Sequence, residues 1–176
     1  MLEGKRIFLR HPQEPDQDEY IALNLRSASF HRGLASPPKT PEQYAAFLRR
    51  CRGDTNVWFF ICRREDAAIL GSISLMEIVR GAFQGAYLGY QIGAEFARQG
   101  YMTEAVALML RYAFVDLKLH RLEANIQPGN VPSIALVKRA GFVKEGYSKR
   151  YLKICGRWRD HERWAILVED WRTRKS

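Results

Sequence analysis

The stretch Tyr87-Leu-Gly-Tyr-Gln-Ile-Gly93, followed by Ala94-Glu-Phe-Ala-Arg-Gln-Gly-Tyr-Met-Thr-Glu-Ala105, has the order strand, short basic loop, one glycine, helix. Free N–H groups in such a loop, together with the positive end of the helix dipole, form an anion-binding site. Gly100 removes the Cβ that would keep a pyrophosphate away from the backbone. The stretch lacks the P-loop and dinucleotide glycine patterns, and a purely structural turn is the alternative interpretation.

A second element lies about thirty residues downstream, where Asn130-Val-Pro-Ser133 precedes an amphipathic helix that ends at Gly141. Asn and Ser at a helix start are common caps, so the motif alone does not indicate a ligand. Its distance from Gly100 is more informative, because one helix and one strand separate the two helix starts. We expect both helix starts at the same end of adjacent strands.

The remaining pattern predicts a mixed sheet with irregularly interleaved helices, because strand-like and helix-like segments do not alternate strictly. We find no repeat, low-complexity tract or interdomain linker, and expect a single domain over residues 1–176. The predicted helices are 15–28, 41–51, 102–119 and 131–140, and the predicted strands are 6–10, 57–62, 69–79, 86–92, 121–127, 142–151 and 158–168.

These residues resemble the GNAT acetyltransferases. Arg98-Gln-Gly-Tyr-Met-Thr-Glu-Ala105 is similar to their acetyl-CoA pyrophosphate loop, and Asn130-x-x-Ser133 with Gly141-Phe142 is similar to their second cofactor motif. The resemblance is strongest to the RimJ/RimL type, which acetylates ribosomal-protein N-termini, and the first sixty residues match only in outline. It extends over Val79-Arg-Gly-Ala-Phe83, Tyr87-Leu-Gly-Tyr90, Lys144-Glu-Gly-Tyr147 and Gly156-Arg-Trp-Arg-Asp-His161.

The resemblance implies an α/β (α+β) GNAT fold, with a mixed, mostly antiparallel twisted sheet, helices on both faces, and splayed central strands that hold acetyl-CoA. It places the pyrophosphate on backbone amides and the pantetheine arm on the strand and the second motif. Ala97 and Met102 depart from the usual loop side chains, but backbone donors survive both changes. The implied cofactor contacts are Ile92, Arg98, Gln99, Gly100, Tyr101, Met102, Thr103, Asn130 and Ser133.

The resemblance also implies direct attack of an amine on the thioester, with an oxyanion stabilised by a backbone N–H of the 86–92 strand. Gly89 in that strand indicates either a bulge or close packing. Val137 occupies the position of the tyrosine acid found in many GNAT enzymes, which leaves Ser133, Tyr147 or a bound water as the acid. The candidate bases are Glu77, Tyr90, Glu123, Asp160 and His161, with Asp160 and His161 preferred. Each of these side chains also has a purely structural interpretation.

Charge and composition limit the functional classes to which the protein can belong. The net charge is +9, and from residue 138 onward 12 Lys and Arg stand against 5 Asp and Glu, a net charge of +7. Such a region attracts RNA, ribosomes or cofactor phosphates, although an ordinary basic surface has the same composition. Three widely spaced cysteines predict reduced thiols in a cytoplasm and no metal site. No signal peptide or membrane span is expected.

We therefore expect an acetyl-CoA-dependent N-acetyltransferase, monomeric or homodimeric, that acts on a protein N-terminus such as that of a ribosomal protein. With pKa values of about 7.8 and about 10.4, roughly 14% of an α-amine but only about 0.04% of a lysine is neutral at pH 7. A site without an evident strong base is therefore better suited to an α-amine. The alternatives are a small-molecule acetyltransferase for a polyamine, antibiotic or amino-acid analogue, and a non-catalytic acyl-CoA-sensing or RNA-binding ribosome-assembly factor.

Overall fold

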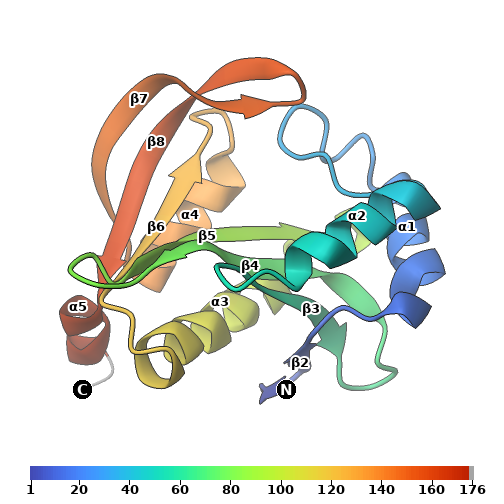
Figure 1. Ribbon diagram of the computed structural model, residues 1–176, viewed down its shortest axis with the longest axis horizontal. Coiled ribbons are helices and arrows are strands. Elements are labelled where there is room, and N and C mark those ends of the chain that lie inside the picture. The colour runs from blue at the N-terminus through green and yellow to red at the C-terminus, as the bar shows by residue number, and fades with distance from the viewer. Residues whose placement is uncertain (175–176) are drawn as a thin grey trace.

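The computed structural model describes residues 1–174 and contains an eight-stranded sheet of order β1-β2-β3-β4-β5-β6-β8-β7 (Figure 1). Neighbouring strands are antiparallel except β5 and β6, which are parallel. The strands are β1 Leu2–Glu3, β2 Ile7–Arg10, β3 Val57–Arg63, β4 Ile69–Val79, β5 Gly85–Ile92, β6 Arg121–Ile126, β7 Val143–Ile154 and β8 Arg157–Leu167.

Helices cover both faces of this sheet. α1 and α2 lie on one face over β3 and β4, whereas α3 and α4 lie on the opposite face. Short 3-10 turns at Glu14–Asp16 and Ala94–Phe96 precede α1 and α3. The helices are α1 Gln17–Arg26, α2 Pro41–Cys51, α3 Tyr101–Arg111, α4 Val131–Ala140 and α5 Val168–Thr173.

The apolar run of β3 is explained by burial on both faces. Phe59 and Ile61 belong to the core beneath α3, while Phe60 and Cys62 belong to the core beneath α1 and α2. Because successive side chains of a strand point to opposite faces, a strand covered on both sides is apolar at every position. The central strands are therefore held rigidly between two helical layers.

The two halves of the sheet separate between β5 and β6. β5 pairs with β4 along its whole length, but it pairs with β6 only from Gly85 to Tyr87. Beyond Tyr87 the strands diverge, and Figure 1 shows β6, β8 and β7 running away from the direction of β3–β5. The expected splayed central strands are present, and they leave a gap that α3 and α4 approach with their N-termini.

Local signals predicted α2 and α4 with their observed bounds, but the end of the third helix and the position of the bulge differ from expectation. The helix expected to reach residue 119 ends as α-helix at Arg111 and continues as a π-helical turn, Tyr112–Asp116. The bulge lies in β4, where Glu77 has φ 51°, and not at Gly89. Gly89 serves packing, because an added Cβ would lie 2.8 Å from the methyl carbon of Met76.

The strand β1 and the helix α5 were not predicted from the sequence. β1 has only two residues, and α5 has six, so neither carries a periodic pattern long enough to detect. Within residues 1–174, every helix is too short or too polar to cross a lipid bilayer.

Candidate active site

The loop before α3 exposes an uncapped helix N-terminus. Arg98 and Gly100 both have left-handed backbone, with φ 62° and φ 84°, and α3 begins directly after them at Tyr101. The side chains of Thr40 and Asn130 cap α2 and α4, but no side chain of the described residues caps α3. First-turn N–H groups without a partner attract an anion. This end of α3 therefore fits the pyrophosphate expected from the sequence.

Arg6 adds a positive charge to this loop. Its guanidinium donates to the carbonyl of Gln99 (3.0 Å), forms an ion pair with Glu104 (3.4 Å) and lies over the ring of Tyr101. Glu104 also accepts the backbone N–H of Arg6 (2.8 Å), so the start of β2 and the first turn of α3 are fastened together. No sequence pattern indicates this cation, because Arg6 lies 98 residues before Glu104.

The edge of β5 that faces the gap has no strand partner beyond Tyr87, although the imidazole of His31 forms a hydrogen bond with the backbone of Ile92. The N–H of Gly93 donates to the carbonyl of Leu70 on β4 (2.8 Å), which fixes the alternation of the strand. The main-chain groups of Tyr90 and Ile92 therefore point away from β4, toward the side where β6 has diverged. Such an edge binds an extended chain of amides in the manner of an added strand.

A bond between two hydroxyl groups crosses the gap on the α3–α4 face. The hydroxyl of Tyr90 lies 2.6 Å from that of Ser133 in the first turn of α4. Burial raises the pKa of Tyr90 to about 12, so its phenol is protonated at neutral pH. Val137, one turn beyond Ser133, is fully buried in the core. Tyr90 thus brings a phenol from β5 to the first turn of α4. Val137, at the position where many GNAT enzymes carry a tyrosine, lies one turn further along α4.

Asn130 acts as a helix cap in this structure. Its side-chain oxygen accepts the backbone N–H of Ser133 (3.4 Å), and Pro132 occupies the first turn of α4. Asn130 also lines a polar cavity of about 590 Å³ together with Tyr147, Trp158 and Asp160. The structure thus brings together three of the residues selected from the sequence, Asn130, Tyr147 and Asp160.

Both oxygens of the Asp160 carboxylate accept hydrogen bonds. It accepts hydrogen bonds from the hydroxyl of Tyr147 (2.6 Å) and from the backbone N–H of Arg150 (2.7 Å). These bonds lower the pKa of Asp160, and the neighbouring carboxylate raises the pKa of Tyr147. The two side chains therefore stabilise each other in the ionised carboxylate and protonated phenol forms.

His161 is buried on β8, where its Nδ1 lies 3.0 Å from the carbonyl of Arg159. Burial lowers its pKa, so the imidazole is neutral at pH 7. Of the other candidate bases, Glu123 accepts a hydrogen bond from Arg121 (2.8 Å), and Glu77 lies at the bulge of β4. The roles of Asp160, His161 and Ser133 in catalysis stay predictions.

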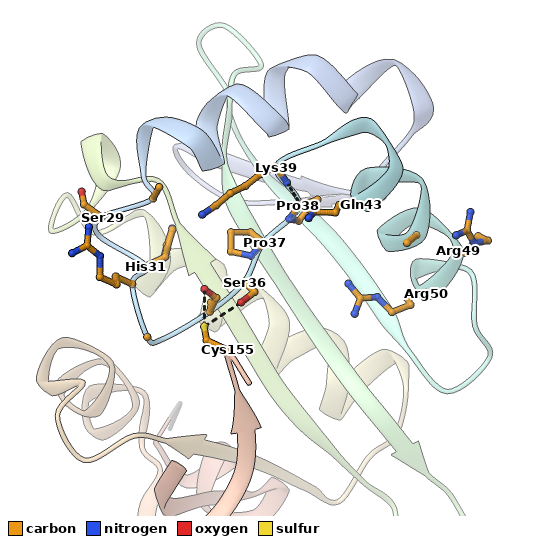
Figure 2. Close-up of a pocket in the computed structure, with 15 residues that line it drawn as sticks. Ser29, His31, Ser36, Pro37, Pro38, Lys39, Gln43, Arg49, Arg50 and Cys155 are labelled. Carbon is orange, nitrogen blue, oxygen red and sulfur yellow. Dashed lines mark hydrogen bonds between the residues drawn. The ribbon is translucent and has the colours of Figure 1, made fainter. Parts of the chain in front are cut away.

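A larger cavity, of about 1060 Å³, lies between the α1–α2 loop, α2 and the tip of the β7–β8 hairpin (Figure 2). It was not predicted from the sequence. Ser36 and Cys155 connect the loop to the hairpin tip, with 3.1 Å between hydroxyl oxygen and sulfur. Figure 2 shows Lys39 reaching toward His31, whose pKa is lowered by burial and by Lys39. The lining contains the cations Arg32, Lys39, Arg49 and Arg50 and no Asp or Glu.

Among residues 1–174, no three His, Cys, Asp or Glu side chains are grouped in a way that could hold a metal ion. This region presents main-chain donors, hydroxyl groups and cations. The loop before α3, the edge of β5 and the first turn of α4 converge on the gap between β5 and β6.

Comparison with known proteins places this geometry in a family. The family described as acetyltransferase (GNAT) domain matches residues 6–143. The chain is 36% identical over 179 residues to the probable N-acetyltransferase YjcK of Bacillus subtilis, covering 97% of this chain and 98% of the relative. It is 40% identical over 166 residues to the [ribosomal protein uS5]-alanine N-acetyltransferase of Escherichia coli, covering 94% of this chain and 78% of that protein.

A solved structure agrees with these relatives. Mycobacterium smegmatis RimJ in complex with CoA-disulfide superimposes with a TM-score of 0.84 at 27% identity, covering 93% of this chain and 82% of that chain. The mixed, mostly antiparallel sheet agrees with the fold that the resemblance implied. The chain belongs to the GNAT family of N-acetyltransferases, with ribosomal-protein-alanine N-acetyltransferases among its relatives.

Proposed function

We propose that this enzyme transfers the acetyl group of acetyl-CoA to the N-terminal α-amino group of a protein, with a ribosomal protein as the acceptor class. The observation that carries the acceptor assignment is the cavity of about 1060 Å³, whose lining has four cations and no carboxylate. The ribosomal-protein part rests on relatives such as the E. coli uS5-alanine enzyme.

The gap between β5 and β6 fits acetyl-CoA. The backbone amides from Arg98 to Thr103 and the guanidinium of Arg6 offer positive charge to a pyrophosphate. The edge of β5 at Ile92 and the first turn of α4 at Asn130 and Ser133 offer hydrogen-bond partners to the pantetheine amides. Acetyl-CoA supplies an activated thioester, and the chain supplies the groups that position it.

Two groups of the chain support the transfer step. The N–H of Tyr90 points into the gap and is the donor best placed for the developing oxyanion. On the α3–α4 face, Ser133 gives a proton to the leaving thiolate and is resupplied by the phenol of Tyr90. The amine attacks first, which forms the C–N bond and a tetrahedral oxyanion, and the C–S bond then breaks. The nitrogen gives its extra proton to water, and water returns a proton to the phenol of Tyr90, so the chain regains its starting state.

The acceptor amine enters from the face that carries α1 and α2. Carboxylates would be needed to bind a polyamine, but the cavity on this face presents Arg32, Lys39, Arg49 and Arg50. The candidate bases Asp160 and Glu123 are engaged with Tyr147 and Arg121 and do not act as strong bases. An α-amine, which is partly neutral at pH 7, suits these conditions better than lysine or spermidine. Neutral or acidic residues after the N-terminus fit the cations.

The proposal is tested by measuring CoA release with three acceptors at pH 7. These are a peptide with a free N-terminus and no lysine, an N-blocked peptide with a single lysine, and spermidine. The free-N-terminus peptide is expected to react at least 10 times faster than either of the others. Faster transfer to the lysine peptide or to spermidine would refute the N-terminal assignment, while any transfer at all still reports the acetyltransferase activity of the family.

A further inference from the structure

The side-chain oxygen of Asn125 is buried in the protein without a hydrogen-bond partner among the described residues. Buried polar atoms are paired in the great majority of cases, because an unmet acceptor costs free energy. An unpaired acceptor at an enzyme site therefore indicates a donor that arrives with a ligand. Asn125 could not be identified from the sequence, because an Asn within a strand-like segment has no distinctive spacing.

Asn125 lies on the face of β6 that points away from α3 and α4. Its neighbours Ala124 and Ile126 are buried in the core beneath those helices, so Asn125 faces the opposite side. Gln127, two residues further along the same face, donates to the carbonyl of Gly33 in the α1–α2 loop (2.9 Å). At Gln127, this face of β6 therefore meets the loop that also lines the cation-rich cavity.

Along the strand direction, Asn125 also lies level with the part of β5 that no longer pairs with β6. Tyr87 and Glu123 form the last pair between β5 and β6, so two residues further along each strand are Gly89 and Asn125. Next to Gly89 is Tyr90, whose N–H points into the gap. Asn125 and the hydroxyl pair of Tyr90 and Ser133 are thus on opposite faces of the same opening.

We propose that the side-chain oxygen of Asn125 accepts a hydrogen bond from the acceptor amine and holds the nitrogen toward the thioester carbonyl. This inference deepens the proposed function and depends on it. An amide oxygen is neutral, so it orients the amine without stabilising the ammonium form as a carboxylate would. The lone pair of the nitrogen then remains free to attack. Asn125 selects amines that are already partly deprotonated in solution, as an α-amine is.

The side chain of Asn125 has two alternative roles, which variants distinguish. The pantetheine amides could donate to it, in which case loss of the oxygen weakens acetyl-CoA binding. The side-chain amide could also lie the other way round and donate to the oxyanion, since oxygen and nitrogen of an amide are similar in shape. Asn125→Ala removes both functions, whereas Asn125→Asp keeps an acceptor oxygen and removes the donor.

The experiment measures the kinetics of both variants with the free-N-terminus peptide, and acetyl-CoA affinity by calorimetry. Asn125→Ala is expected to raise the KM for the peptide at least 10-fold and to change the Kd of acetyl-CoA less than 2-fold. Asn125→Asp is expected to keep the KM for the peptide within 3-fold of the wild type. Asn56→Ala, which removes a paired amide outside the gap, controls for destabilisation alone.

Three results would overturn the inference: an unchanged KM for the peptide in Asn125→Ala, an acetyl-CoA Kd raised 10-fold in that variant, or equal losses of kcat in both variants without a change in KM. Wild-type enzyme in the same assay separates this inference from the proposed function. If the wild type does not acetylate the peptide, the N-terminal assignment fails, and the variants are compared on the amine that the wild type does acetylate.

Discussion

The hydroxyl groups of Tyr90 and Ser133 lie 2.6 Å apart, although 43 residues separate them in the chain. The bond joins β5 to the first turn of α4 across the gap in the sheet. It places a protonated phenol beside the serine that the second cofactor motif provides. Under the proposed function, this phenol stands in for the tyrosine acid whose position in α4 is occupied by the buried Val137.

Tyr90→Phe tests this compensation. Loss of the phenol is expected to lower kcat about 10- to 100-fold, in the range of a lost general acid, while the KM values of both substrates change little. Steady-state kinetics with the variant measure kcat and the two KM values separately. Tyr112→Phe, another tyrosine on the α3 side of the core, is the matched control and is expected to keep full activity. A wild-type kcat in Tyr90→Phe would assign the proton to water instead.

Gly100→Glu tests the pyrophosphate loop. The added carboxylate is expected to meet the pyrophosphate and to weaken acetyl-CoA binding more than 100-fold, as measured by calorimetry. Any side chain at φ 84° is strained, so Gly100→Asn serves as the control, since Asn tolerates left-handed backbone. The control is expected to bind within a few-fold of the wild type. Equal affinity of the two variants would remove the pyrophosphate from this loop.

Arg6→Gln tests the cation that the fold brings to the same loop. The variant is expected to bind acetyl-CoA about 10-fold more weakly at low salt, and the difference is expected to shrink as ionic strength rises. Arg64→Gln, an exposed cation paired with Glu3, provides the comparison and is expected to bind normally. A defect in Arg6→Gln that does not depend on salt would indicate that Arg6 only fastens the loop to β2.

Asn130→Ala separates capping from cofactor binding. Loss of the cap is expected to cost about 1 kcal/mol of stability. Thr40→Ala removes the corresponding cap of α2, where the hydroxyl accepts the N–H of Gln43 (3.3 Å), and matches this cost. We expect Asn130→Ala alone to raise the Kd of acetyl-CoA. If the two variants lose equal stability and neither changes cofactor affinity, Asn130 is only a cap.

Alkaline pH is expected to destabilise the protein through its buried tyrosines. Burial raises the pKa of both Tyr20 and Tyr90 to about 12, above the ordinary value of 10.0. The folded state therefore binds these protons more tightly than the unfolded state does. This difference contributes on the order of 2 kcal/mol per group to the free energy of unfolding below pH 10. The contribution is lost as the pH rises from 10 to 12. Melting temperatures measured from pH 9 to 11.5 check this. Tyr20→Phe should show a shallower decline than the wild type.

Sequence reasoning was most successful where the signals are local. Thr40 and Pro41 mark the start of α2, and Asn130 and Gly141 mark the two ends of α4, so both helices were predicted within their observed bounds. Each signal lies within a residue or two of the boundary that it sets. The splayed strands were predicted only through the resemblance, since no local pattern indicates where two strands separate.

Contacts between distant segments could not be predicted. Arg6 reaches Gln99 in the loop before α3, and Gln127 reaches Gly33 in the α1–α2 loop, through separations of 93 and 94 residues. Neither contact leaves a spacing that a single sequence reveals. The unpaired oxygen of Asn125 is likewise a property of packing, because only the folded chain shows which polar atoms find partners.

The separation of β5 from β6 makes the sheet incomplete without its cosubstrate. Beyond Tyr87, the N–H groups of Tyr90 and Ile92 have no strand to exchange hydrogen bonds with on the gap side. In the free enzyme these amides, although central in the sheet, exchange their hydrogens with solvent as an edge strand does. A pantetheine arm bound along this edge, as proposed above, would take the place of the missing strand, slow this exchange and link the two halves of the sheet. The weakest hydrogen bonding of the sheet thus lies at its centre, at the place where the proposed cosubstrate would bind.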